Sequence, residues 1–132
     1  MPLPVTALYA ALSALLLLLL AFRVVQARWK YKTSLGTGTE PGMERAVRVH
    51  ANFVEYVPLA LLLMGLAEAN GAPAAGLHAA GAVLLASRVL HAWGLSKVSG
   101  RSFGRFYGTA GTWLMLLLLA LGNLLLLAGF GG

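Results

Sequence analysis

The chain has 132 residues, of which 59% are apolar and 11% are charged, whereas about a quarter of the residues in ordinary soluble domains are charged. This composition, with a mean hydropathy of +0.80, excludes a disordered chain and argues strongly against a soluble globular domain. The chain contains no cysteine, so it supplies no thiolate nucleophile, disulfide or zinc–thiolate site of its own.

The formal net charge of +6 would suit a nucleic-acid-binding protein, but its distribution does not. A nucleic-acid interface needs a solvated basic face. Here the basic residues stand at the ends of apolar runs, as they do at the ends of membrane spans. The composition therefore predicts the lipid bilayer as a partner and excludes nucleic acid.

The first apolar run extends from Leu3 to Phe22 without a charged residue. A cleaved signal peptide begins with positive charge and has a shorter apolar core, whereas the first basic residue here, Arg23, follows the run. We therefore expect a first transmembrane helix that stays in the mature protein.

Three further apolar stretches follow, and each is long enough for a spanning helix of about 20 residues. The segment after the first helix is basic and then loop-like, because Gly36, Gly38, Pro41 and Gly42 are expected to break a helix. We expect an all-α bundle of four transmembrane helices in one integral membrane domain, residues 1–132. The expected helices cover about residues 3–27, 43–69, 74–95 and 105–128.

The ten basic residues of the chain flank the two long loops of this arrangement. None lies near the N-terminus, in the turn at 70–75 or after Arg105. A four-span arrangement places all of them on one side of the membrane, and the positive-inside rule makes that side cytoplasmic. The sequence therefore predicts a multi-pass membrane protein with cytoplasmic basic loops and both termini on the non-cytoplasmic side.

Several polar residues lie inside the expected spans, where a charge at the helix centre costs about 2.5 to 3.5 kcal/mol. On the second helix Glu44, Arg48, Asn52 and Glu55 are spaced i, i+4, i+8 and i+11, which places them on one stripe. A carboxylate a full turn inside a span, as at Glu55, indicates a functional site.

The third and fourth helices carry matching polar faces. Arg88, His91 and Leu95 share a face of the third helix. A face of the fourth is lined by Arg105, Thr109, Thr112 and Asn123. Packed together, these faces would form a cationic pocket that opens to the cytoplasm, with Asn52 and Glu55 deeper inside.

Such a pocket suits a small polyanionic ligand with one amine. Arginines bind carboxylates through bidentate hydrogen bonds, a buried Glu can take an ammonium group, and an Arg beside a thiol favours the thiolate.

Simpler interpretations stand beside this one. Arg48 can pair with Glu44 one turn away. Arg28 fits a topology signal better than a ligand contact, and Asn123 fits an interhelical hydrogen bond. Three His without Cys or clustered carboxylates make a weak case for a metal, and we expect no metal site.

The motif of the second helix has a recognisable form. Residues 44–58, ERAVRVHANFVEYVP, resemble the signature of the MAPEG family, the membrane-associated proteins in eicosanoid and glutathione metabolism, whose core pattern is Arg-x-His-x-Asn-x-x-Glu followed by Pro. Residues 35–38, 88–91 and 105–109 resemble the preceding loop, the third-helix motif and the start of the fourth helix. The chain is most similar to the short bacterial members, which implies the inner membrane and a resemblance to microsomal glutathione transferases.

This resemblance implies a homotrimer that binds glutathione as co-substrate between adjacent subunits, near the cytoplasmic face. It implies that Arg48, Asn52 and Glu55 hold the glutathione backbone, with Glu55 at the γ-glutamyl amine. His91 would line the same site from the third helix.

The resemblance also implies a reaction. Arg105 would lie beside the sulfur and stabilise a thiolate that attacks a lipophilic electrophile or hydroperoxide, as in transferases and peroxidases. Arg28 would add a contact from the neighbouring subunit. Two positions depart from the pattern: Ala51 replaces a frequent Arg, and Leu95 replaces a frequent Tyr.

Two alternatives belong to other classes of protein. One is a catalytically inactive MAPEG-fold protein with a binding or structural role, which the residues at 51 and 95 motivate. The other is a small proton-coupled transporter that uses Glu55. Against it, the polar side chains other than Asn123 are expected toward one end of the bundle, so that no polar path crosses the bilayer.

Overall fold

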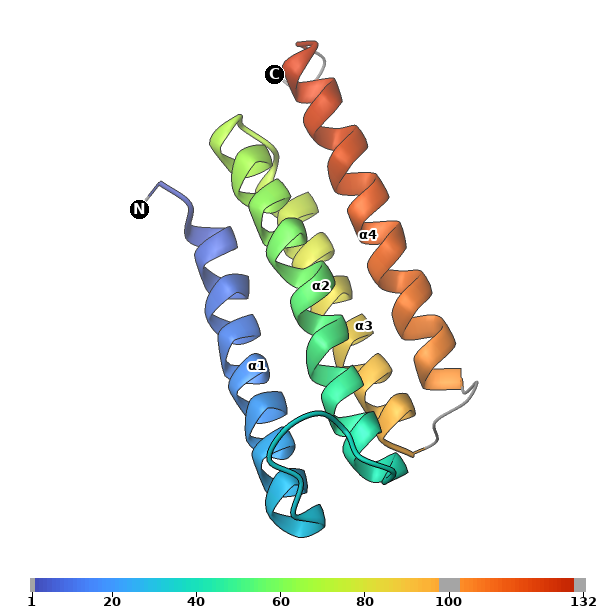
Figure 1. Ribbon diagram of the computed structural model, residues 1–132. Helices are drawn as coiled ribbons and strands as arrows, with labels where there is room; N and C mark the ends of the chain where they lie inside the picture. The colour runs from blue at the N-terminus through green and yellow to red at the C-terminus, as the bar shows by residue number, and fades with distance from the viewer. Residues whose placement is uncertain (1, 98–102, 130–132) are drawn as a thin grey trace.

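Four antiparallel helices make up the computed structural model of the protein, which describes residues 2–97 and 103–129 (Figure 1). Each helix is long and apolar enough to cross a membrane, as the sequence predicts. The helices are α1 (Pro4–Tyr31), α2 (Pro41–Ala69), α3 (Ala74–Lys97) and α4 (Phe103–Leu127).

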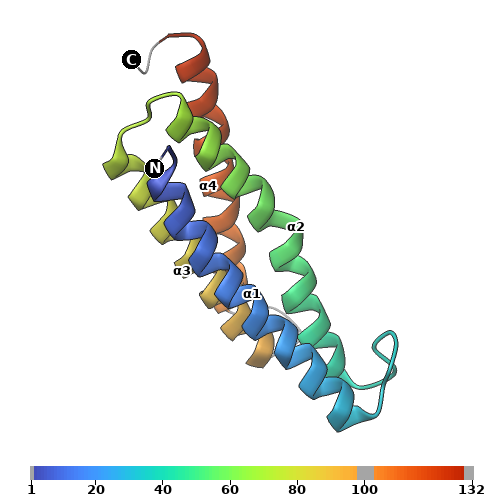
Figure 2. The same cartoon turned by 90° about the vertical axis from the view of Figure 1, so that its left-hand side faces the viewer.

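The central pair of the bundle is α2 and α3. Both pack against α1 on one side and against α4 on the other, as the two perpendicular views show (Figures 1 and 2). Helix α1 begins and helix α4 ends at the same end of the bundle, which we call the terminal end. The opposite end carries the loop at 32–40 and is called the basic end.

The helix boundaries differ from the expected ones at the basic end. Helix α1 continues to Tyr31, beyond the expected end near residue 27, and stops where Lys32 adopts a left-handed conformation with φ 51°. Helix α2 begins at Pro41, so the expectation that Pro41 and Gly42 break a helix is wrong. The first helical position makes no intrahelical N–H bond, and Pro is therefore well tolerated there.

Two clusters of buried apolar side chains hold the helices together. The cluster near the terminal end joins all four helices and includes Tyr9, Met64, Leu84 and Leu119. The second cluster lies toward the basic end; its members are Leu20, Val49, Phe53, Val57 and Ala92. The leucines of α1 and α4 that point away from both clusters are exposed, as expected for side chains that face lipid.

A close approach of backbones sets the distance between α3 and α4. A Cβ added at Gly108 would lie 2.6 Å from the backbone nitrogen of His91 and from the carbonyl oxygen of Ser87. Small residues allow membrane helices to pack at such short range. The side chains of His91 and of its neighbours on α3 are thereby held directly against α4.

Polar contacts also join helices at the terminal end. The carboxylate of Glu68 on α2 accepts hydrogen bonds from the backbone N–H groups of Val5 (3.0 Å) and Thr6 (3.2 Å) at the start of α1. The Tyr9 hydroxyl lies 3.1 Å from Nδ1 of His78 and donates to the His78 carbonyl. The expectation that polar residues other than Asn123 lie toward one end is therefore wrong, because the first turn of a helix leaves N–H groups that need an acceptor.

Asn123 makes the interhelical contact that its position suggests. Its side-chain Nδ2 donates to the carbonyl oxygen of Leu63 on α2 at 2.9 Å.

Replacing Glu68 by Gln is expected to destabilise the start of α1. The amide accepts more weakly than the carboxylate, and hydrogen bonds to charged groups contribute about 1.5 to 3 kcal/mol. Hydrogen exchange of the Val5 and Thr6 amides in detergent should become faster, and thermal unfolding should begin at a lower temperature. Glu40→Gln is the matched control, because the Glu40 side chain makes no capping hydrogen bond to α2. Equal exchange in both variants would contradict this role of Glu68.

Candidate functional site

A buried arginine lies at the centre of the polar residues of the basic end. The Arg88 side chain on α3 is only 2% exposed. Its Nη1 donates to Oγ1 of Thr112 on α4 at 3.2 Å, and its Nη2 donates to Oδ1 of Asn52 on α2. Nδ1 of His91 lies 3.4 Å from the same Nη2. One guanidinium therefore joins three helices.

The hydroxyl of Thr112 has two partners in this network. It accepts from Arg88 and donates to the carbonyl oxygen of Gly108 at 2.8 Å. The side chain is completely buried, so no water can replace either bond. Thr112 thus connects α4 to the buried guanidinium by a hydrogen bond. Its place on the polar face of α4 was predicted, but its contact with Arg88 was not.

An ion pair lies on the outer side of α2 beside this network. Nη2 of Arg48 is 3.6 Å from Oε1 of Glu55, and both side chains are 51% exposed. Within the described part of the chain Arg48 thus pairs with Glu55 two turns further on rather than with Glu44 one turn back. The two residues present both signs of charge on an open face.

The helices that pack against α2 bury only part of its polar stripe. Asn52 points inward to Arg88, as expected for a residue deep in the bundle, whereas Glu55 is half exposed and not deep in a closed pocket. The helix rotates by about 100° per residue, so Asn52 is turned by about 40° from Arg48 and about 60° from Glu55 around the axis of α2. The expected pocket is an open face in the single chain.

Arg105 and His91 belong to the same region. Arg105 is exposed in the first turn of α4, and His91 is buried at 2% exposure. The backbone nitrogen of Arg105 lies against Gly94, three residues after His91 on α3. Five of the predicted site residues are therefore gathered at the basic end. They are Arg48, Asn52, Glu55, His91 and Arg105.

Arg28 is not part of this group. Its Nη1 donates to the carbonyl oxygens of Thr33 (3.2 Å) and Gly36 (3.0 Å), and these bonds close the loop after α1. Ala51 lies half-buried on α2, and the side chain of Leu95 lies outside the described part of the structure.

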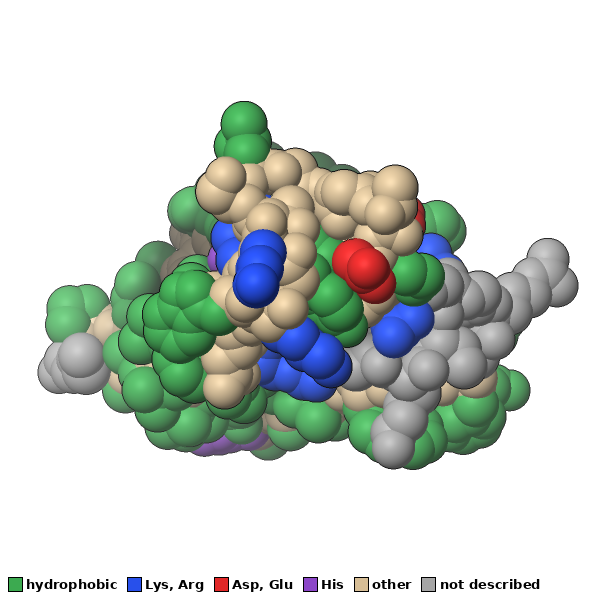
Figure 3. Space-filling view, turned by 60° about the horizontal axis from the view of Figure 1, so that its bottom comes forward, with side chains coloured by type: hydrophobic (Ala, Val, Ile, Leu, Met, Phe, Trp, Pro, Cys, Tyr) green, Lys and Arg blue, Asp and Glu red, His purple; other side chains and the backbone are tan. Residues whose placement is uncertain are grey.

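Figure 3 shows the basic end from below, where Lys and Arg side chains gather among apolar ones. The model of the MAPEG family matches residues 6–125. The chain belongs to the MAPEG family.

Curated relatives support this assignment. The chain is 44% identical to inner membrane protein YecN of Escherichia coli strain K12 over 120 residues, which cover 91% of this chain and 90% of the relative. The protein of the same name from strain O6:H1 gives the same values. Together with the four apolar helices, this makes the chain a multi-pass MAPEG protein of the inner membrane, as the motifs predict.

Replacing Thr112 by Val is expected to destabilise this MAPEG protein by about 1 to 3 kcal/mol, because an Arg88 donor is left unsatisfied in a buried site. Valine has nearly the same shape as threonine, so packing is preserved. Unfolding in detergent measures the loss. Thr109→Val, one turn earlier on α4 and half-buried, serves as control and should change stability by less than about 0.5 kcal/mol. A Thr112 variant as stable as the control would show that the Arg88 network contributes little.

Proposed function

We propose that this MAPEG protein binds glutathione on the open face of α2 and activates its thiolate against lipophilic electrophiles or hydroperoxides from the bilayer. The observation that carries the proposal is the half-exposed pair of Arg48 and Glu55, which lies beside the buried cation of Arg88. It offers a positive and a negative group 3.6 Å apart.

The γ-glutamyl end of glutathione carries a carboxylate and an ammonium group on one carbon. The guanidinium of Arg48 would take the carboxylate through two parallel hydrogen bonds, and the carboxylate of Glu55 would take the ammonium. The ligand would then replace one ion pair by two. His91 and Asn52 would line the site beneath it.

Arg105 would favour the thiolate form of glutathione over the thiol. The thiolate is the reactive nucleophile, and a guanidinium close to the sulfur stabilises its negative charge. In a transferase reaction the sulfur forms a bond to an electrophilic carbon, and the leaving group departs with the electron pair of the broken bond. Because Arg105 lies in the first turn of α4, which begins at Phe103, a lipophilic substrate would reach this position at the basic end.

The exposed ion pair on α2 also supports the assembly of several copies of the chain. A charged pair in a transmembrane helix is costly where it meets lipid, and a neighbouring chain that covers α2 would remove that contact. We therefore include a homotrimer in the proposal, with Arg28 reaching the ligand from the adjacent subunit through its second Nη group. The basic end would face the cytoplasm and both termini the other side.

The transporter alternative would need a polar path between the two ends of the bundle. Ala60, Met64 and Leu84 are fully buried between the Arg88 network and the polar contacts of Glu68. Along the described ranges 2–97 and 103–129, apolar side chains thus separate the two polar groups, and a one-sided binding site is the better explanation.

Calorimetry with detergent-purified protein is expected to detect saturable glutathione binding, and Glu55→Gln should weaken it at least tenfold. Hydrogen bonds to charged groups contribute about 1.5 to 3 kcal/mol, and about 1.4 kcal/mol corresponds to a factor of ten. Glu44→Gln is the control, because Glu44 is exposed near the start of the same helix, and it should change binding less than twofold. Absence of binding at millimolar glutathione in a folded protein would overturn the proposal and favour a MAPEG protein with a binding or structural role only.

Arg105→Ala is expected to reduce thiolate formation more than glutathione binding. Loss of a nearby positive charge should raise the pH at which half of the bound thiol is ionised by about 1 unit or more. The ultraviolet absorbance of the thiolate at pH 7 measures this change, and Arg105→Lys, which keeps the charge, should retain part of the signal. Unchanged thiolate absorbance in Arg105→Ala would exclude this role for Arg105.

A further inference from the structure

A second cationic site lies between α1 and α2 at the basic end, on a different face of α2 from the ion pair. It is a hollow with a volume of about 360 Å³. Three positive side chains line it: Arg23 and Lys30 from α1 and Arg45 from α2. None of the described residues that line the hollow is acidic.

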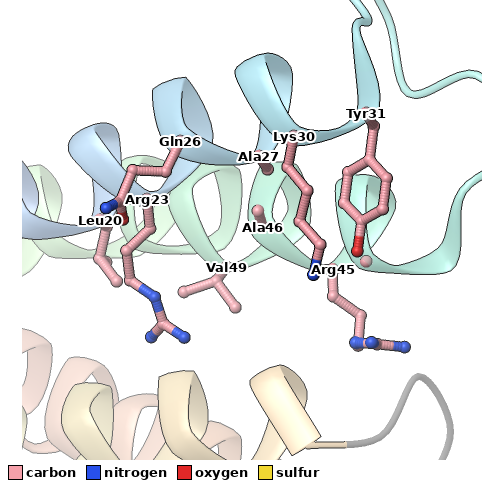
Figure 4. A pocket seen from close by; sticks show the side chains of 10 residues that line it. Leu20, Arg23, Gln26, Ala27, Lys30, Tyr31, Arg45, Ala46 and Val49 are labelled. Carbon is pink, nitrogen blue, oxygen red and sulfur yellow. The ribbon is translucent and has the colours of Figure 1, made fainter.

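The two helices present matching faces to this hollow. Residues 23, 26, 27 and 30 of α1 and residues 42, 45, 46 and 49 of α2 follow the same spacing of i, i+3, i+4 and i+7, which places each set on one helix face. In Figure 4 the side chains of Arg23, Lys30 and Arg45 extend in the same direction, Arg23 and Arg45 beyond the two ribbons and Lys30 across the ribbon of α2. An anion at this side would be attracted by all three charges.

The inner part of the hollow is apolar. Leu20 and Val49 are each 3% exposed and belong to the apolar cluster of the basic end, and the small side chains Ala27 and Ala46 leave space above them. The hollow thus has cationic groups at its opening and an apolar floor. A ligand that fits both parts carries a negative charge and a hydrocarbon portion.

Hydroxyl and amide groups complete the lining. The Tyr31 hydroxyl lies against the first turn of α2, where a Cβ at Gly42 would overlap it. The Gln26 side chain lines the hollow from α1. These uncharged groups can bind hydroxyls of a ligand whose charge is held by the three cations.

The depth of the hollow in the membrane identifies the ligand class. Arg23 is the first charged residue after the apolar run of α1, so the hollow lies where hydrocarbon gives way to lipid head groups. Basic pockets between transmembrane helices at this depth suit the head groups of anionic lipids. We propose that the hollow between α1 and α2 binds the phosphate of an anionic phospholipid through Arg23, Lys30 and Arg45, with the acyl chain on Leu20 and Val49.

Native mass spectrometry in detergent tests this site with phosphatidylglycerol and phosphatidylcholine as probes. Phosphatidylglycerol should bind about tenfold more tightly, and Lys30→Gln and Arg45→Gln should each weaken it about tenfold, since a lost hydrogen bond from a charged group corresponds to about that factor. Lys32→Gln is the matched control: it removes a charge two residues from Lys30, at a residue that does not line this hollow. It should change binding less than twofold.

Two further measurements separate the possible outcomes. Lys30→Arg keeps the positive charge and should keep the preference for phosphatidylglycerol. This result would show that Lys30→Gln weakens binding through the lost charge. Inorganic phosphate at the lipid concentration should not displace the lipid, because phosphate has no hydrocarbon portion for the apolar floor. Equal binding of both lipids, equal effects of Lys30→Gln and Lys32→Gln, or displacement by inorganic phosphate would each overturn the proposal.

Discussion

The burial of one guanidinium inside the membrane-spanning part of the bundle determines how the helices are arranged. Arginine stays charged in proteins and must be given acceptors wherever it is buried. The two terminal nitrogens of Arg88 find acceptors on α2, α4 and α3 itself, at Asn52, Thr112 and His91. Meeting these contacts fixes the rotation of α2 and requires the close approach of α3 and α4 at Gly108.

The placement of the functional groups follows from this rotation. Once Asn52 points inward, Arg48 and Glu55 must lie on the open side of α2, where a ligand or a neighbouring chain can reach them. Another face of the same helix then meets α1 and forms the cationic hollow around Arg45. Helix α2 therefore contributes to both proposed sites, and the apolar layer at Met64 and Leu84 separates them from the terminal end.

The four spans could be predicted from the sequence because four predominantly apolar stretches of about 20 residues have few other stable structures. Helical periodicity also indicates that Asn52 can meet the polar face of α3. Periodicity describes one helix at a time, however, and does not give its rotation against neighbours, so the half exposure of Glu55 was not foreseen. The cap that Glu68 forms on α1 depends on two helix ends that are far apart in sequence, and Arg28 binds loop carbonyls whose positions only the folded chain defines.

A crystal structure of the protein with bound glutathione tests the central claim most directly, because it locates the ligand relative to the Arg88 network. The account predicts the γ-glutamyl group between Arg48 and Glu55, the sulfur beside Arg105, and a neighbouring chain that covers the open face of α2. Glutathione bound instead in the hollow between α1 and α2, or an unoccupied α2 face in contact with lipid, would contradict it.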